Sequence, residues 1–270
     1  MQSYGIPAGL VSRLREAGCV YAEEEAVLLL SGAPGAAVLD LMVARRLAGQ
    51  PLEQVLGWAS FGGLRVGLRP GVFVPRRRTE FLAEQAVHVL AGRSTALVVE
   101  LCCGSGAVAM VVSAAVPDCR VYAVDLHPDA VECARSNLPQ AAVLQGDLFL
   151  ALPQELRGRV DLVVANAPYV PTGALATLPR EARNYEPAAT FDGGRNGLDT
   201  VGRIISEAPQ WLGFRGKVLL ECSEEQAGAV GGLLAAAGLS PEILRNEETD
   251  ATVAVGSAPP RRMKGIRQTG

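Results

Sequence analysis

Three acidic side chains and one glycine-rich turn occupy positions at which a nucleoside could bind. Glu100 lies at the end of an apolar stretch, and the turn Cys102-Cys103-Gly104-Ser105-Gly106 follows it. Glycines allow a tight turn and bring backbone amides close to a ligand. Asp125 ends the next apolar stretch, where a carboxylate can accept hydrogen bonds from both ribose hydroxyls, and Asp147 follows a third stretch, where it can accept from an adenine amino group. This pattern favours a nucleoside pocket over three unrelated helix caps or turns.

A second cluster, Asn166-Ala167-Pro168-Tyr169, follows a fourth apolar stretch. The side-chain oxygen of Asn166 can accept a hydrogen bond from an incoming NH2 group, and the chain break at Pro168 frees a carbonyl, at Ala167 or Pro168, for the second N–H. The ring of Tyr169 can pack against a planar group. An amide nitrogen is a poor nucleophile, so it needs acceptors that orient its lone pair toward an electrophile. The same residues could also be a plain Asn-x-Pro turn at a strand end.

The cofactor predicted from these two clusters is S-adenosylmethionine, with S-adenosylhomocysteine as the product and no metal. An NAD-binding fold would share the glycine turn and the acid after the second strand. No constellation suited to hydride transfer follows, and the two histidines are His88, on a predicted helix, and His127, beside Asp125. A sulfonium methyl needs no acid to activate it, which suits a site that offers hydrogen-bond acceptors and no strong base.

The elements that must position these residues alternate between strand and helix beyond Thr79. Apolar runs predict strands at Ala96–Leu101, Arg120–Asp125, Ala141–Gln145, Val160–Asn166 and Lys217–Cys222, with weaker signals at Glu242–Leu244 and Thr252–Val255. Helical patterns fit Thr79–Leu90, Ala107–Ala115, Asp129–Leu138, Gly197–Leu212 and Glu225–Ala237. Such alternation is typical of an α/β fold with a parallel sheet covered on both faces. The short loop before the last strand predicts that this strand runs antiparallel.

The chain divides into four predicted regions. Residues 1–49 show helical spacing without a strand signal and predict a small helical domain, for which the family resemblance given below implies substrate recognition. Residues 50–78 predict a linker and a β-hairpin, because Leu64, Val66 and Leu68 alternate before Val72-Phe73-Val74. Residues 79–257 predict the catalytic domain. Residues 258–270 predict a flexible basic tail carrying Arg261, Arg262, Lys264 and Arg267.

Composition excludes several classes of function. Hydrophobic residues make up 49% of the 270 and charged residues 20%, which allows a large core and excludes wholesale disorder. A net charge of -3 gives no electrostatic footprint for bulk nucleic-acid binding, so a nucleic-acid partner is not expected. The chain shows no secretory signal, and no apolar run approaches the ~20 residues of a membrane helix. The six cysteines form no CxxC pair and are typical of reduced thiols in the cytoplasm.

Residues 50–256 resemble the glutamine-N5 methyltransferases that modify peptide-chain release factors or a ribosomal protein. Residues 51–57 (PLEQVLG) are similar to that family's linker, residues 74–80 (VPRRRTE) to its IPRPETE segment, and residues 166–169 (NAPY) to its NPPY tetrapeptide. Tyr185-Glu186-Pro187 with the glycines that follow, and Leu219-Leu220-Glu221 with Gln226, resemble two further segments of the family. The resemblance implies a seven-stranded Rossmann-like class I methyltransferase sheet with a small N-terminal helical domain.

The resemblance also implies roles for individual residues. The cofactor site would comprise Arg76, Thr79, Glu100, Cys102, Cys103, Gly104, Ser105, Gly106, Asp125, Leu126, Asp147, Leu148 and Asn166. The acceptor would be held by Asn166, Ala167, Pro168, Tyr169, Glu186 and Pro187, with Asn166 and Tyr169 as the catalytic pair. The implied acceptor is a glutamine in a protein, such as a translation factor or a ribosomal protein.

Three departures from the family keep other acceptors open. Ala167 replaces the first proline of NPPY, and Cys102-Cys103 replaces the usual Gly-Thr, although cysteine tolerates positive φ poorly. The helical region before Gln50 is also shorter than the family's helical domain, the part expected to recognise a protein partner. One alternative is a small-molecule N-methyltransferase acting on an amide, amidine or amino group. Another is a nucleic-acid adenine N6-methyltransferase, because adenine presents the same planar NH2 group.

Overall fold

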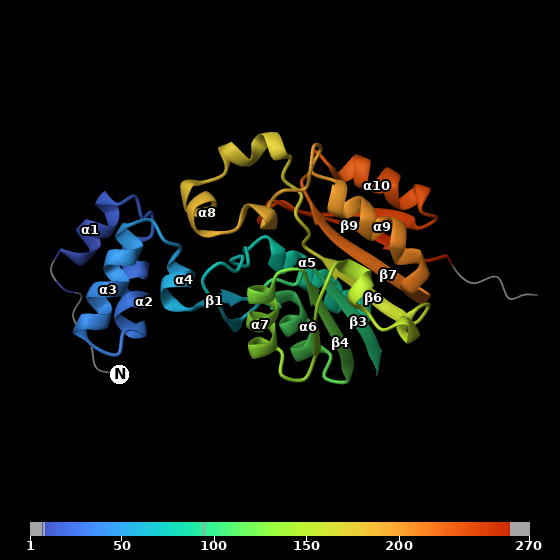
Figure 1. The fold of residues 1–270 in the computed structure, drawn as a ribbon, viewed down its shortest axis with the longest axis horizontal. Helices are drawn as coiled ribbons and strands as arrows, with labels where there is room; N and C mark the ends of the chain where they lie inside the picture. The colour runs from blue at the N-terminus through green and yellow to red at the C-terminus, as the bar shows by residue number, and fades with distance from the viewer. Residues whose placement is uncertain (1–6, 8, 94, 260–270) are drawn as a thin grey trace, which may run out of the picture.

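The computed structural model describes residue 7 and residues 9–93 and 95–259, and its N-terminal part is a group of short helices (Figure 1). These helices are α1 (Leu10–Glu16), α2 (Ala22–Gly32) and α3 (Ala36–Leu47), and they enclose a core of their own that includes Leu14 and Leu29. Val55 of α4 (Leu52–Leu56) packs in the same core. The segment predicted as a linker therefore contains a helical turn that belongs to this core.

A hairpin of β1 (Trp58–Phe61) and β2 (Leu64–Gly67) follows, with Phe61 paired to Leu64. It turns at Gly62 and Gly63, whose φ angles of 55° and 75° lie in the left-handed region that favours glycine. The hairpin lies within the region 50–78, and Val72-Phe73-Val74 lies outside it. The backbone amide of Val74 donates to the carboxylate of Glu186 at 3.0 Å, which draws this stretch away from the hairpin.

A seven-stranded sheet forms the centre of the C-terminal part, in the order β5-β4-β3-β6-β7-β9-β8. Its strands are β3 (Ala96–Leu101), β4 (Cys119–Asp125), β5 (Ala142–Gln145), β6 (Val160–Ala165), β7 (Leu212–Cys222), β8 (Ser240–Asn246) and β9 (Ala251–Ser257). Strands β3 to β7 pair in parallel, whereas β9 is antiparallel to both β7 and β8. The predicted α/β class and the antiparallel final strand are confirmed. Because β3 lies between β4 and β6, their carboxyl ends meet at one edge of the sheet.

Helices cover both faces of this sheet (Figure 1). They are α5 (Thr79–Leu90), α6 (Ala107–Ala115), α7 (Pro128–Asn137), α9 (Asp199–Trp211) and α10 (Ala227–Ala236). The connections contain α8 (Arg180–Tyr185) and the short turns η1 (Leu148–Ala151), η2 (Gln154–Leu156), η3 (Thr172–Thr177) and η4 (Ala188–Thr190). Helices α5, α6 and α7 pack on the face that buries Val98 and Val164. Helices α9 and α10 pack on the face that buries Val99 and Val163. Since alternate residues of a strand point to opposite faces, covering both faces explains the continuous apolar runs in the sequence.

The segment from Thr172 to Thr190, which contains α8 and is named here the α8 segment, links the two parts of the molecule. It arches between the helical domain and the sheet in Figure 1. Arg46 of α3 forms an ion pair with Glu181 at 3.2 Å. The hydroxyl of Tyr185 donates to the carbonyl of Ala48 at 2.9 Å, and the side chain of Gln54 donates to the carbonyl of Tyr185 at 3.2 Å. The position of the helical domain is therefore tied to the α8 segment.

Two further predictions concern the basic tail and membrane-spanning helices. The basic residues of the predicted tail, Arg261, Arg262, Lys264 and Arg267, lie outside them. Within the described part of the chain, every helix is too short or too polar to cross a membrane.

Candidate active site

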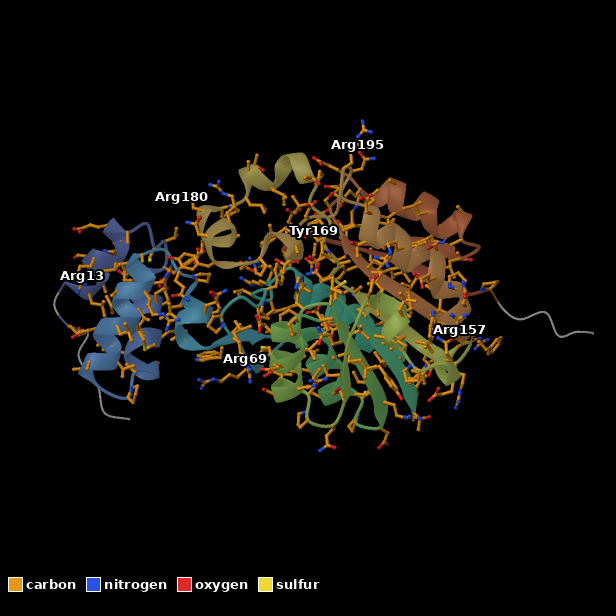
Figure 2. The ribbon with its side chains drawn as sticks, in the orientation of Figure 1. Arg13, Arg69, Arg157, Tyr169, Arg180 and Arg195 are labelled. Carbon is orange, nitrogen blue, oxygen red and sulfur yellow. The ribbon has the colours of Figure 1, made fainter. Side chains whose placement is uncertain are left out.

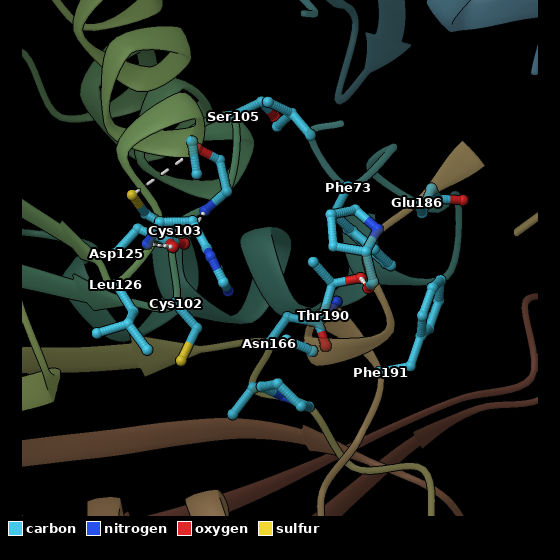
Figure 3. A pocket seen from close by; sticks show the side chains of 18 of the residues that line it. Phe73, Cys102, Cys103, Ser105, Asp125, Leu126, Asn166, Glu186, Thr190 and Phe191 are labelled. Atoms are coloured by element: carbon cyan, nitrogen blue, oxygen red, sulfur yellow. Dashed lines mark hydrogen bonds between the residues drawn. The ribbon is translucent and has the colours of Figure 1, made fainter. Parts of the chain in front are cut away.

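A cavity of about 500 Å³ opens at the carboxyl edge of the sheet. Figure 3 shows Cys102, Asp125 and Leu126 on one side of this cavity and Phe73 and Phe191 on the other. Every residue predicted for the site lines the cavity except Gly106. Asn166 lies at the border between the two sides in this view. The side with Asp125 is named here the nucleoside side, and the side with Phe73 the acceptor side.

The glycine turn after β3 keeps its left-handed backbone despite the cysteines. Cys102 has a φ of 54° and Gly104 has the same value, while Gly106 has 76°. A Cβ atom at Gly106 would lie 2.6 Å from Cδ1 of Leu138, so this glycine is needed for packing of α6 against α7. Burial raises the pKa of the Cys102 and Cys103 thiols well above the usual cysteine value, which makes both poor nucleophiles.

Asp125 holds the two loops that form the nucleoside side. Its Oδ2 accepts a hydrogen bond from the amide of Gly104 at 2.9 Å, and its Oδ1 accepts from the amide of His127 at 2.9 Å. Each carboxylate oxygen has two lone pairs, so each can accept one further hydrogen bond from a ligand in the cavity. The carboxylate is thus fixed by backbone amides and keeps acceptor capacity toward a diol.

Glu100 differs from Asp125 in its environment. Its side chain is buried, and its Oε2 accepts from the amide of Ala109 in the first turn of α6 at 2.9 Å. Burial raises the pKa of Glu100, the hydrogen bond from Ala109 lowers it and the charge of Asp125 raises it, and the net result is a pKa of about 8. Glu100 therefore anchors α6 on β3, at the floor of the cavity.

Asp147 is already engaged by another side chain. Its Oδ2 accepts from Arg203 of α9 at 2.7 Å, and both side chains are about half exposed at the mouth of the cavity. Leu126, 58% exposed, and Leu148, buried with a φ of 49°, line the same end. These two leucines offer an apolar surface to a flat base, and the second oxygen of Asp147 remains available as an acceptor.

On the acceptor side, the amide group of Asn166 has a defined direction. Its Nδ2 donates to the hydroxyl oxygen of Thr79 at 3.1 Å, which leaves its Oδ1 as an acceptor. Among the described residues, no hydrogen bond uses the carbonyl of Ala167 or Pro168, whereas the carbonyl of Tyr169 accepts from Gln226 at 2.8 Å. The tetrapeptide thus presents a side-chain oxygen and free backbone carbonyls, as expected of a site that accepts hydrogen bonds from an NH2 group.

Arg13 and Arg195 lie at the outline of the molecule in the view of Figure 2, whereas Tyr169 lies near its middle. Its hydroxyl donates to Oε1 of Glu221 at 3.1 Å, and Nε of Arg78 lies 3.7 Å from the same oxygen. Burial raises the pKa of Tyr169 well above its usual value, and the Glu221 carboxylate adds to the effect. Tyr169 is therefore a neutral phenol, and the hydrogen bond of its hydroxyl to Glu221 holds the ring in place.

An ion pair and two aromatic rings close the acceptor side of the cavity. The carboxylate of Glu186, fully buried, accepts from Arg76 and from the amide of Val74. Arg76 also lies 4.9 Å from the ring centroid of Phe73, and Phe73 meets Phe191 edge to face at 5.6 Å. The guanidinium of Arg76 is thus committed to Glu186, and the wall of the cavity at this end is aromatic.

Among the lining residues that sequence reasoning did not assign to the site are two aromatic and two charged side chains: Phe73, Phe191, Arg203 and Glu221. Glu221 carried a signal, because it is an acid near the carboxyl end of an apolar strand, as Glu100 and Asp125 are. Phe191 follows Glu186-Pro187 closely and could have been included with them. The other two had no signal in the sequence, since Arg203 reaches the site from α9 and Phe73 from an irregular stretch.

Similar proteins are methyltransferases. A family model described as a methyltransferase domain matches residues 98–185. A release factor glutamine methyltransferase from Streptomyces coelicolor is 38% identical over 193 residues, which are 70% of this chain and 68% of the relative. A 4-amino-L-phenylalanine/4-methylamino-L-phenylalanine methyltransferase from Streptomyces pristinaespiralis is 37% identical over 203 residues, which are 73% of this chain and 69% of the relative.

A solved structure supports the fold. A 16S rRNA N2 methyltransferase from T. Thermophilus, in complex with AdoMet and guanosine, superposes with a TM-score of 0.55. The match covers 75% of this chain and 50% of that one, at 18% sequence identity. At this identity the likeness shows a common fold and nothing about the acceptor.

Proposed function

The chain belongs to the release factor glutamine methyltransferase family, and we propose that it transfers a methyl group from S-adenosylmethionine to the side-chain amide nitrogen of a glutamine in a protein. The observation that carries this proposal is the direction of the Asn166 amide. Its NH2 group is used on Thr79 at 3.1 Å, so its oxygen is the atom left to meet the acceptor. A primary amide brings two N–H donors, and Asn166 with a free carbonyl at Ala167 or Pro168 supplies two acceptors.

The nucleoside side of the cavity fits S-adenosylmethionine. Asp125 would accept from the ribose hydroxyls through the lone pairs that Gly104 and His127 leave free. The apolar surfaces of Leu126 and Leu148 suit an adenine ring, and the glycine turn brings backbone amides close to the ligand. When bound, the cofactor supplies an electrophilic methyl group on a positively charged sulfur.

The chain's own residues then act on the acceptor nitrogen. Two hydrogen bonds from its N–H groups fix its orientation, with the lone pair directed away from Asn166 and Tyr169. Methylation of this nitrogen would place positive charge on it and make its N–H groups more acidic. The acceptor oxygens become stronger partners for the more acidic N–H groups, so they stabilise the transition state more than the ground state. Loss of one proton from this nitrogen to water would then give the neutral methylated amide.

We further propose that the helical domain, residues 1–49, binds the protein that carries the glutamine, such as a translation factor or a ribosomal protein. Five of the nine large hydrophobic side chains exposed in the described part of the chain belong to this domain: Val20, Tyr21, Val27, Val38 and Leu41. Exposed apolar side chains of this kind are typical of protein-binding surfaces. The six free thiols fit the reducing cytoplasm in which translation takes place.

A second candidate acceptor is a small aromatic amine. One relative at 37% identity is named for 4-amino-L-phenylalanine and its monomethyl derivative. Phe73 and Phe191, which meet edge to face at 5.6 Å, form a wall against which an aromatic ring could pack. Such a ring would present its amino group to the same acceptors as a glutamine amide would.

Transfer of a labelled methyl group separates the two acceptors. The full chain is incubated with S-adenosylmethionine carrying a tritiated methyl group and with protein and small-molecule fractions of a bacterial extract. For the proposed function, label enters a protein, and hydrolysis of that protein in strong base releases labelled methylamine from the amide. For the second candidate, label stays on a small molecule, because an aryl C–N bond does not hydrolyse under these conditions. Label in neither fraction would refute both.

A further inference from the structure

The α8 segment forms part of the wall of the acceptor side and has almost no core of its own. Leu178 and Ala182 of this segment line the cavity, and Figure 3 shows Glu186 on the same side as Phe73. Within the segment, all of which the structure describes, only Ala182 and Glu186 are buried. Because so few side chains are packed, apolar burial contributes little to holding this wall, and its polar contacts decide where it lies.

The two ends of the α8 segment are anchored next to the cavity. At its start, the hydroxyl of Thr172 donates to the carboxylate of Asp192 at 2.7 Å, and the amide of Thr172 donates to the carbonyl of Gly194 at 3.0 Å. Toward its end, the carboxylate of Glu186 forms its ion pair with Arg76. These contacts fix where the segment begins and ends, but they leave the position of α8 between them open.

The helical domain and α4 hold the middle of the segment. Arg46 pairs with Glu181 at 3.2 Å, and the hydroxyl of Tyr185 donates to the carbonyl of Ala48 at 2.9 Å. The side chain of Gln54, 5% exposed, donates to the carbonyl of Tyr185 at 3.2 Å. Between the two anchors, every hydrogen bond that joins described residues of the segment to a distant part of the chain is one of these. The middle of the cavity wall therefore depends on the helical domain for its position.

Arg46 has the geometry that this link requires. Its Nε and Nη2 donate to the two carboxylate oxygens of Glu25 at 2.6 and 3.1 Å. Its Nη1 donates to the carbonyl of Gln50 at 3.1 Å and to the carboxylate of Glu181 at 3.2 Å. Only 12% of the Arg46 side chain and 11% of the Glu25 side chain are exposed. Since a guanidinium is a rigid fork of donors, the pair with Glu25 fixes the direction in which Nη1 meets Glu181, which a lysine could not do.

We propose that the helical domain positions the wall of the acceptor side, with Arg46 as a positioning residue that holds the α8 segment in place through Glu181. The inference rests on the proposed function, because it takes the acceptor to bind against this wall. The loops of the nucleoside side are fixed by their own contacts with Asp125. Loss of the link should therefore weaken the binding of the acceptor and leave the binding of the cofactor unchanged.

The first test needs no acceptor, so its failure can be told apart from a failure of the proposed function. The amides of Arg183 and Glu186 form hydrogen bonds within the segment, so their hydrogen exchange, followed by NMR, reports how often the segment opens. In both Glu181→Ala and Arg46→Lys, their protection should fall about three- to tenfold, as expected for the loss of one polar contact. Glu181→Ala leaves the pair of Arg46 with Glu25 intact, so it tests the link without disturbing the helical domain.

The double variant Arg46→Lys with Glu181→Ala makes this test sharper. Because both changes break the same contact, the double variant should lose no more protection than the single variants do. Tyr185→Phe removes a separate hydrogen bond, so its addition to Glu181→Ala should lower the protection about three- to tenfold more. Arg180→Gln, which changes an exposed charge in the same turn of α8, is the matched control and should not lower it.

The second test measures methyl transfer to the fraction that takes up tritiated methyl groups in the experiment above, protein or small molecule. In the variant with both Glu181→Ala and Tyr185→Phe, the apparent KM for this fraction should rise about tenfold, because only molecules with the wall in place bind the acceptor. The rate at saturating acceptor and the calorimetric Kd of S-adenosylmethionine should stay close to those of the wild type. Arg180→Gln should leave all three quantities unchanged.

Two results would overturn the inference. Wild-type protection of the Arg183 and Glu186 amides in both Glu181→Ala and Arg46→Lys would show that this contact does not hold the segment. A wild-type KM in a variant whose segment opens more often would show that the position of the wall does not matter to the acceptor. A lower melting temperature with unchanged protection of these amides would also count against it, since that is the effect of a purely structural residue.

Discussion

Replacement of Asp125 by alanine should weaken binding of S-adenosylmethionine strongly without unfolding the chain. The carboxylate makes two hydrogen bonds of 2.9 Å to backbone amides, from Gly104 and His127, which fix both oxygens at the cavity wall. Hydrogen bonds to a charged group contribute about 1.5–3 kcal/mol each. Two bonds to the ribose give an upper limit of about 3–6 kcal/mol, and water in the open cavity replaces part of them. We therefore expect a loss of about 2–4 kcal/mol, which is roughly a 30- to 1,000-fold increase in Kd.

Isothermal titration calorimetry with S-adenosylmethionine and with S-adenosylhomocysteine measures this change. Asp125→Asn is the more specific variant, because one carboxylate oxygen becomes an NH2 group that must face a backbone N–H. Its Kd should lie between those of the wild type and of Asp125→Ala. Asp118→Ala, an exposed acid just before β4, is the matched control and should bind as the wild type does. Wild-type affinity in Asp125→Ala would refute the assignment of this side of the cavity to a ribose.

Three further predictions concern the acceptor turn, the glycine turn and the helical domain. Ala167→Pro should keep most of the methyl-transfer rate, because the amide of Ala167 makes no hydrogen bond among the described residues and the NPPY tetrapeptide that residues 166–169 resemble has proline at this place; a large fall in kcat would contradict this. Gly106→Ala should lower the melting temperature by several degrees, because its Cβ would lie 2.6 Å from Cδ1 of Leu138 at a φ of 76°, a strain of about 2–5 kcal/mol; thermal unfolding at the wild-type temperature would contradict it. Leu41→Ser, at a side chain 60% exposed on α3, should lower kcat/KM for a protein acceptor and leave the cofactor Kd unchanged, whereas Phe214→Ser, 54% exposed on the sheet domain, should change neither; equal kcat/KM values for these two variants would refute the role of the helical domain.

The parallel strands were predictable from the sequence because they are buried on both faces. A run such as Ala96–Leu101 is apolar except for Glu100, and the chain has few other ways to bury its apolar side chains. The hairpin was predictable as an element but not in its extent, because β1 before the turn at Gly62 and Gly63 gave no separate alternating signal. The turn of α4 was missed for a different reason. It has only five residues, and its formation depends on the contact of Val55 with the helical domain.

The site was predictable where chemistry and strand ends coincide. Glu100, Asp125 and Asn166 could be grouped because parallel strands end at one edge of a sheet. The hydrogen-bond partners of Asn166, Tyr169 and Asp147 could not be assigned, since Thr79, Glu221 and Arg203 come from elements far apart in the chain. Their pairing depends on how α5, β7 and α9 pack on the sheet. The direction of the Asn166 amide is therefore a property of the folded structure, although each residue in the chain of contacts is visible in the sequence.

The most direct measurement is a pair of experiments on Asn166→Ala. Calorimetry gives its affinity for S-adenosylmethionine, and a single-turnover assay at saturating cofactor gives its rate of methyl transfer to the labelled acceptor. Since Asn166 acts mainly on the acceptor nitrogen, the affinity should stay close to that of the wild type, and the rate should fall about 10²–10³-fold, as is typical of losing one preorganised polar partner. A rate equal to that of the wild type would remove the Asn166–Tyr169 turn from catalysis.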